Sequence, residues 1–165
     1  ATPVSMTEIQ DFPLQETKTV IQSHIMAMFL PSLITPFLIR WLSISGVLLL
    51  GILSMVLSIS IAIFDQGYWG YWTALVLLGL GWNFLFVGGT TLLMQSYQPQ
   101  EGFRVQAVNE VLVFSTQAIM SLMAGWLVFS YGWFVVNLLS IPLLILALIM
   151  LSRWYVVNTK QLRDE

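Results

Sequence analysis

Residues 72–94 read WTALVLLGLGWNFLFVGGTTLLM, an apolar stretch without a charged residue. An α-helix rises about 1.5 Å per residue, so about 20 apolar residues cross the ~30 Å hydrocarbon core of a bilayer. We therefore predict that this stretch spans a membrane. It also holds small and polar residues that a simple anchor would not need, which indicates that other helices pack against it or move past it: Gly79, Gly81, Trp82, Asn83, Gly88, Gly89, Thr90 and Thr91.

The composition of the whole chain agrees with this reading. Its 165 residues are 58% hydrophobic and 8% charged, whereas soluble domains carry about 25% charged residues. With six Lys and Arg residues and a net charge of −2, the chain lacks the basic clusters that bind nucleic-acid phosphates. One histidine, no cysteine and no carboxylate cluster predict no metal site and no cofactor, and no catalytic set that a membrane-embedded enzyme would need.

The apolar pattern predicts an all-α integral membrane protein, folded as a polytopic helical bundle. Residues 1–6 are expected to be the end of a truncated transmembrane helix, 7–153 the bundle, and 154–165 a tail. Five complete transmembrane helices are expected within the bundle, at about 17–39, 44–64, 72–94, 105–128 and 134–152.

Cations near the helix ends set the expected orientation, because Lys and Arg are retained on the cytoplasmic side. Lys18 falls on one side of the five spans, and the other side, predicted to be cytoplasmic together with the C-terminus, holds Arg40, Arg104, Arg153, Lys160 and Arg163. Amphipathic rings in the expected loop at residues 65–72 are predicted to lie at the headgroup level: Tyr68, Trp69, Tyr71 and Trp72.

Polar side chains at membrane depth are candidates for function, because they are costly unless they face protein or water. Asn83 shares a helix face with Gly79 and Thr90, so it could lie at the floor of a central cavity or join two helices. Trp82 and Phe86 could pack internally or shape a cavity for an amphipathic ligand.

The fourth expected span is the most polar and carries a stripe at helical spacing, which suits a water-lined path. Gln117 lies at mid-depth and is the candidate for solute contact. Glu110 could relay a proton or cation, and we favour an ion pair with Arg40 or Arg104. The stripe consists of Gln106, Glu110, Gln117, Ser121 and Gly125.

His24 lies on the first expected span and is either a hydrogen-bonded packing residue, which we favour, or a group for proton coupling. Pro31 on the same span removes a backbone donor and is expected to kink the helix, as is Pro142 in the last span.

Three stretches resemble a known family: SHIMAMFLPSLITPFLIRW (23–41), GLGWNFLFVGGTTLL (79–93) and RVQAVNEVLVFSTQAIMSLMAGWLV (104–128). They are similar to the second, fourth and fifth helices of a six-helix half of a major facilitator superfamily transporter. The resemblance covers nearly the whole chain and implies most of the C-terminal half, with its first helix nearly absent. In that family the first, second, fourth and fifth helices of a half line the cavity.

The same resemblance implies that the protein transports a small solute by alternating access in a bacterial inner membrane. The missing transporter half would be its partner. Asn83 and Gln117 would contact the solute, and Glu110 with Arg40 or Arg104 would form a cytoplasmic latch. The family's cytoplasmic loop would fall at residues 35–43, where Pro36 replaces its first glycine and its aspartate is absent. The family's antiporter motif is not visible in the fourth span. The alternative is a non-transporting membrane scaffold or partner subunit, since stripes of small and polar residues also serve assembly.

Overall fold

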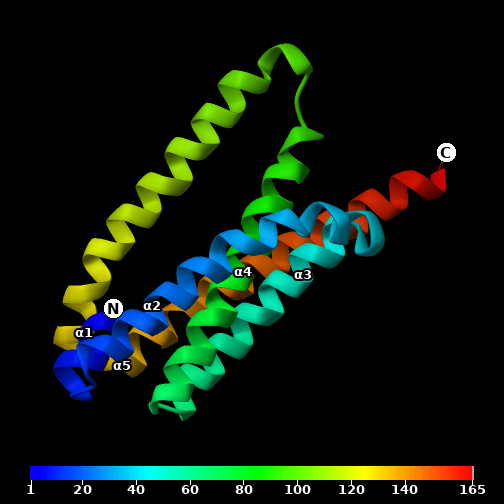
Figure 1. Cartoon of the computed structure of the whole chain (residues 1–165). Coiled ribbons are helices and arrows are strands. Elements are labelled where there is room, and N and C mark those ends of the chain that lie inside the picture. The colour runs from blue at the N-terminus through cyan, green and yellow to red at the C-terminus, as the bar shows by residue number, and fades with distance from the viewer. Residues whose placement is uncertain (165) are drawn as a thin grey trace.

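The computed structural model describes the backbone of residues 1–164 and the side chains through residue 157. Every regular element in that range is helical (Figure 1). In chain order these are α1 (Thr2–Val4), the π-helical turn η1 (Ser5–Ile9), α2 (Leu14–Phe29), the 3-10 helix η2 (Leu30–Leu33), α3 (Thr35–Phe64), α4 (Tyr68–Met94), the 3-10 helix η3 (Pro99–Glu101) and α5 (Gly102–Asp164).

Two of these helices contain a sharp turn. Ser43 in α3 has φ 64° and ψ 168°, and Gly132 in α5 has φ 81° and ψ 169°. Glycine adopts positive φ without steric cost, whereas serine does so rarely. The chain reverses at both points, so that α5 consists of two antiparallel helices (Figure 1). We call residues 102–131 the arm and residues 133–164 the return helix.

Three helices of the described residues are long and apolar enough to cross a membrane: Thr35–Phe64, Tyr68–Met94 and Pro99–Val157. The prediction of an all-α membrane fold is therefore confirmed at that level. The expected first span, 17–39, is divided between α2, η2 and the start of α3. The loop expected at 35–43 is helical through Leu42, and the chain turns only at Ser43.

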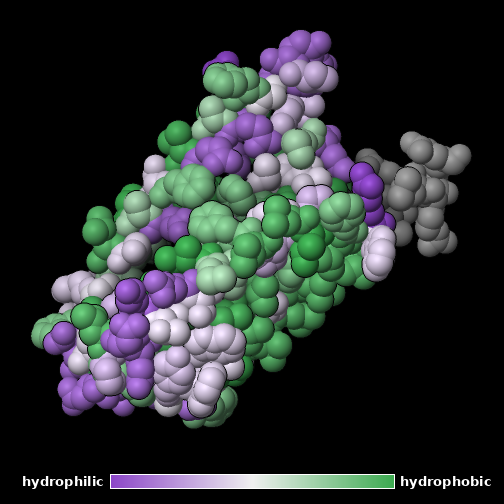
Figure 2. All heavy atoms as spheres, in the orientation of Figure 1, coloured by the Kyte–Doolittle hydropathy of each residue, from purple (hydrophilic) through white to green (hydrophobic). Residues whose placement is uncertain are grey.

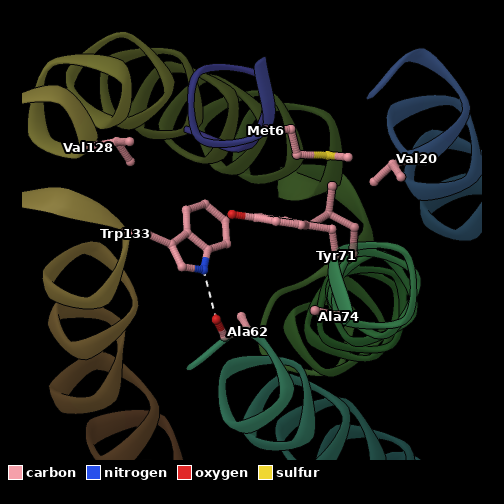
Figure 3. Close-up of a cluster of buried hydrophobic side chains, with 8 residues drawn as sticks. Met6, Val20, Ala62, Tyr71, Ala74, Val128 and Trp133 are labelled. Atoms are coloured by element: carbon pink, nitrogen blue, oxygen red, sulfur yellow. Dashed lines mark hydrogen bonds between the residues drawn. The ribbon is translucent and has the colours of Figure 1, made fainter. Parts of the chain in front are cut away.

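One end of the bundle holds a buried cluster in which segments far apart in sequence meet (Figure 3). Trp133 donates an indole N–H to the carbonyl oxygen of Ala62 at 2.8 Å, and its ring centroid lies 5.2 Å from that of Tyr71. The hydroxyls of Tyr71 and Ser5 are 2.7 Å apart. Tyr71 is 1% exposed, so its ring packs within this cluster, and the expected headgroup level of the four rings stays a prediction. The remaining members of the cluster are Met6, Val20, Ala74, Leu75 and Val128.

Close backbone contact fixes α3 against α4. A Cβ added to Gly81 would lie 2.9 Å from the carbonyl oxygen of Gly51, and one added to Gly51 would lie 3.2 Å from that of Gly81. Small residues let membrane helices approach in this way. The Ser58 hydroxyl donates to the carbonyl oxygen of Ala74 at 2.6 Å and links the same two helices.

The arm is the least packed part of the fold. Of its residues, all of which the structure describes, only Val128 is buried. Figure 1 shows the arm standing apart from the other helices over most of its length. In Figure 2, hydrophobic side chains cover the middle of the bundle, and hydrophilic ones gather at its two ends and along the arm. The packing of this chain therefore holds the arm mainly at its ends.

Candidate functional site

Asn83 lies at the contact between α4 and the end of α2 and is completely buried. Its side-chain amide donates to the Met28 carbonyl oxygen at 2.8 Å and to the Ser32 hydroxyl at 2.6 Å. Its carbonyl oxygen accepts a hydrogen bond from the Thr35 hydroxyl at 2.8 Å. Both amide hydrogens and the oxygen are thus engaged within the protein.

The reason for this arrangement is the break in the helix before it. The α-helical hydrogen bonding of α2 ends at Phe29, and Pro31 stands in the first turn of η2. The last carbonyl groups of a helix have no partner in the same helix, and Pro31 has no N–H to offer. Asn83 supplies a donor at this point. Of the two roles predicted for Asn83, the structure shows the helix-joining contact.

His24 fastens the same two helices one turn earlier. Its Nδ1 lies 2.8 Å from the carbonyl oxygen of Leu75, and because a carbonyl can only accept, Nδ1 is the donor. Trp72 donates its indole N–H to the Ser23 hydroxyl at 3.0 Å. Between these bonds and Asn83, a Cβ on Gly79 would come within 2.7 Å of the His24 carbonyl oxygen. The α2–α4 contact is therefore close and polar along its length.

Four aromatic rings form a continuous row from α2 through α4 to the arm. Trp82 and Phe86 are stacked, with ring centroids 4.8 Å apart and planes 8° from parallel. Phe29 meets Trp82 edge-on at 6.1 Å, and Phe114 of the arm meets Phe86 at 5.9 Å, tilted by 55°. Phe29 and Phe114 are 59% and 46% exposed. We call these four residues the aromatic row.

The polar stripe of the arm lies on the side of the aromatic row. At about 100° per residue, Glu110, Gln117 and Ser121 are all within about 60° of Phe114 around the helix. Since Phe114 contacts Phe86, this side of the arm faces α4. Gln117 and Ser121 are exposed, and Glu110 is partly exposed.

The space beside these groups is open. A Cβ added to Gly89 of α4 or to Gly125 of the arm would meet no described atom within 4 Å. Near the other end of the arm, Gln106 donates to the Tyr97 hydroxyl at 2.7 Å. The sequence thus predicted the stripe, and the structure places it beside Trp82 and Phe86.

The charged residues of the expected latch lie apart from one another in this structure. Within the described part of the chain, Glu110 forms no ion pair with Arg40 or Arg104. Arg40 lies instead over the ring of Phe37, 5.9 Å from its centroid. The latch therefore stays a prediction. Pro142 lies inside the return helix, and α5 has non-helical φ and ψ at Gly132 and not at Pro142.

Two recesses of the surface lie elsewhere. One of about 420 Å³ is bounded mainly by apolar residues of α3 and the return helix, including Ile52, Ile59 and Ile145. A second of about 310 Å³ lies among α3, α4 and the return helix and reaches Asn137 and Ser140. Neither includes Asn83, Gln117 or the aromatic row.

Sequence reasoning missed the partners that hold Asn83 in place. Thr35, completely buried, also donates to the carbonyl oxygen of Pro31 at 2.8 Å. A hydroxyl four residues after a proline is a signal that could have identified it, because serine and threonine bond back to the carbonyl four residues earlier. Ser32 has no comparable signal, because its partner is on another helix.

Comparisons with known proteins identify a family and several relatives. A family model described as the Major Facilitator Superfamily matches residues 5–165. The riboflavin transporter RfnT of Brucella anthropi is 38% identical over 131 residues, which are 78% of this chain and 32% of that protein. Two uncharacterized MFS-type transporters of Bacillus subtilis are also similar. YdeG is 31% identical over 138 residues, 81% of this chain and 32% of that protein, and YddS is 32% identical over 153 residues, 86% of this chain and 33% of that protein.

The chain spans about a third of the length of the curated relatives it matches. These relatives are transporters and not enzymes, as expected from the absence of a catalytic set in the sequence. No solved structure gives a significant match.

Proposed function

Because the chain belongs to the Major Facilitator Superfamily, we propose that it is part of a secondary transporter that moves a small solute by alternating access. In that mechanism one helical bundle rocks against another around a site near the middle of the membrane. The chain supplies an integral membrane bundle, and the rest of the cavity wall belongs to the missing half, on the same chain or on a partner.

The observation that carries this proposal is the position of the arm. Its polar stripe, with Gln117 exposed, faces the aromatic row across open space at Gly89 and Gly125. A polar stripe in a membrane helix suits a water-lined path better than a lipid-facing surface. The closely packed, hydrogen-bonded pair of α2 and α4 forms one side of this space, and the loosely packed arm forms the other.

The five predicted spans are part of the proposal. The first consists of α2, η2 and residues 35–42, the second of 44–64 and the third of α4, and the arm and the return helix are the last two. The turns at Ser43 and Gly132 support this division. The expected side for Arg40, Arg104 and the C-terminus is the cytoplasmic side of a bacterial inner membrane.

The predicted pathway residues divide into two roles. Gln117, Trp82 and Phe86 face the open space and would contact the solute, whereas Asn83 and His24 would hold the wall behind them. Glu110 with Arg40 or Arg104 would close the cytoplasmic side in another state of the transport cycle, in which the arm lies closer to the start of α3. A candidate solute comes from the printed name of one relative, a riboflavin transporter.

The experiment that tests the proposal measures solute uptake by cells in which the transporter carries Gln117→Ala. We expect uptake to fall while the amount of protein in the membrane is unchanged, because Gln117 is exposed. Ser115→Ala, also exposed on the arm but on another side of the helix, is the matched control. If the chain were a non-transporting scaffold, Gln117→Ala would leave solute uptake by its partner protein normal and would reduce assembly with that partner.

A second test uses the chain by itself. Reconstituted in vesicles, it should show no saturable uptake, because half of the cavity wall is absent. Saturable uptake would contradict the half-transporter proposal.

A further inference from the structure

We propose that Phe86 and Phe114 take the planar ring of the transported solute between them, so that the solute is a neutral heteroaromatic compound with a polar edge. This inference deepens the proposed function and rests on it, since it names the class of solute that the open side of α4 would bind. It concerns the aromatic row, which joins three helices but lies outside the buried core.

The first argument is the geometry of Trp82 and Phe86. Aromatic side chains that pack against each other prefer edge-to-face or offset-stacked arrangements. Most ring pairs of the described residues are edge-on or tilted, with planes 55° to 84° apart, whereas Trp82 and Phe86 are parallel within 8°. Two stacked rings one helical turn apart form a short π stack that a third planar ring can extend.

The second argument is the distance to the arm. A planar ring held between two others needs about 7 Å between their centroids, twice the ~3.5 Å contact distance of carbon atoms. Phe86 and Phe114 are 5.9 Å apart and tilted by 55°. The arm would therefore have to move by only about 1 Å and its phenyl ring would have to rotate. The exposed middle of the arm offers little packing to resist that movement.

The third argument is the chemistry beside the rings. Gln117, one turn beyond Phe114 on the same side of the arm, offers both a carbonyl oxygen and an N–H₂ group. These match the carbonyl and N–H edge of a heteroaromatic ring. Glu110, one turn before Phe114, would repel an anionic solute. The open space at Gly89 and Gly125 leaves room for a substituent on the ring.

The test is direct binding of lumichrome, a neutral, fluorescent compound of three fused rings, to the purified chain in lipid nanodiscs. We expect saturable binding that quenches the fluorescence of the compound. Phe114→Leu and Phe86→Leu should each weaken binding about tenfold or more, because stacking on one aromatic side chain contributes that much. Phe114→Tyr, which keeps the ring, should bind within about threefold of the unchanged chain.

Matched controls separate ring stacking from general hydrophobic binding. Trp126→Leu removes an aromatic ring that is 57% exposed on a different side of the arm, so binding should be unchanged. Sorbitol, a neutral polyol without a ring, should not compete. Absence of lumichrome binding to the unchanged chain, or equal affinity in Phe114→Leu, Phe86→Leu and Trp126→Leu, would overturn the inference.

These results are distinguishable from failure of the proposed function. If the transporter takes up a non-aromatic solute and Phe114→Leu leaves uptake unchanged, the transporter stands and the ring site is wrong. If the chain binds lumichrome as described but cells show no uptake of any solute, the ring site stands and transport is wrong.

Discussion

The side-chain amide of Asn83 donates a hydrogen bond to the carbonyl oxygen of Met28, 2.8 Å away on the neighbouring helix. The acceptor is one of the last carbonyl groups of α2, which has no donor within its own helix because the α-helix ends at Phe29. Asn83 is a polar residue within an apolar span, and its buried position is explained by the break at the end of α2. Asn83 of α4 in turn stabilises that break.

Replacing Asn83 by leucine should lower the stability of the bundle. Three hydrogen bonds to α2, η2 and α3 are lost, and at about 0.6 kcal/mol each in membrane helices the loss is about 2 kcal/mol. Thermal unfolding in detergent, followed by circular dichroism, measures it. Asn137→Leu is the control, because the side-chain amide of Asn137 donates its described hydrogen bond to the Trp133 carbonyl oxygen in the same helix. Equal melting temperatures for the two variants would contradict the assigned role.

Gly79→Ala should separate α2 from α4. The new Cβ would lie 2.7 Å from the His24 carbonyl oxygen and 2.9 Å from the Cβ of Ala27, so the helices must move apart. Overpacking of this kind costs about 1–3 kcal/mol. Gly89→Ala on the same helix meets no described atom within 4 Å and should be neutral or stabilising by up to about 1 kcal/mol. Unfolding of the two variants side by side tests the difference, and the prediction fails if Gly89→Ala is the less stable.

Trp133→Phe should destabilise the buried cluster. The carbonyl oxygen of Ala62 lies in the last turn of α3 and receives its hydrogen bond from the Trp133 indole. A buried carbonyl left without a donor costs about 1–3 kcal/mol. Trp126→Phe, at an exposed position of the arm, should change stability by less than about 0.5 kcal/mol. A smaller effect at Trp133 than at Trp126 would show that the indole bond contributes little.

The orientation can be tested with single cysteines, because the chain has none of its own. Gln66→Cys and Gln98→Cys place a thiol in the exposed loops at opposite ends of α4. We expect a membrane-impermeant maleimide applied to intact cells to label residue 66 and not residue 98, because Arg104 follows the second loop on the cytoplasmic side. Permeabilised cells should label both. The reverse pattern in intact cells would invert the proposed orientation.

Glu110→Gln should change transport more than stability. The carboxylate forms no ion pair with Arg40 or Arg104 among the described residues, so this structure loses no such contact when the charge is removed. If the latch forms in another state, solute uptake should change while the melting temperature stays within about 2 °C, since a substitution away from the packed core costs under about 0.5 kcal/mol. A large loss of stability would indicate that Glu110 already has a structural partner in this state.

Much of the fold could be predicted because its determinants are local. The uncharged run at 72–94 became α4, and the pattern of apolar runs and short polar joints anticipated the turns near residues 43 and 132. The stripe on the arm was also visible, because helical spacing puts Gln106, Gln117 and Ser121 on one side whatever surrounds them.

The partners of polar groups could not be predicted in the same way. Tyr71 reads as one of several rings at a membrane interface, yet it is buried against Trp133, 62 positions later in the sequence. Nothing near Tyr71 in the chain signals that contact. The choice between a solute-binding and a helix-joining role for Asn83 was open for the same reason.

The sequence by itself determined that this chain is a helical membrane protein, because the length and apolarity of a segment fix its free energy in lipid without reference to any other segment. Only the tertiary structure decided which polar groups are already satisfied. Asn83 and His24 are engaged between helices, and Gln117 is exposed beside the rings of Phe86 and Phe114. Hydrogen bonding and ring stacking act over a few ångströms, so they depend on how the helices are arranged and not on the residues of one helix.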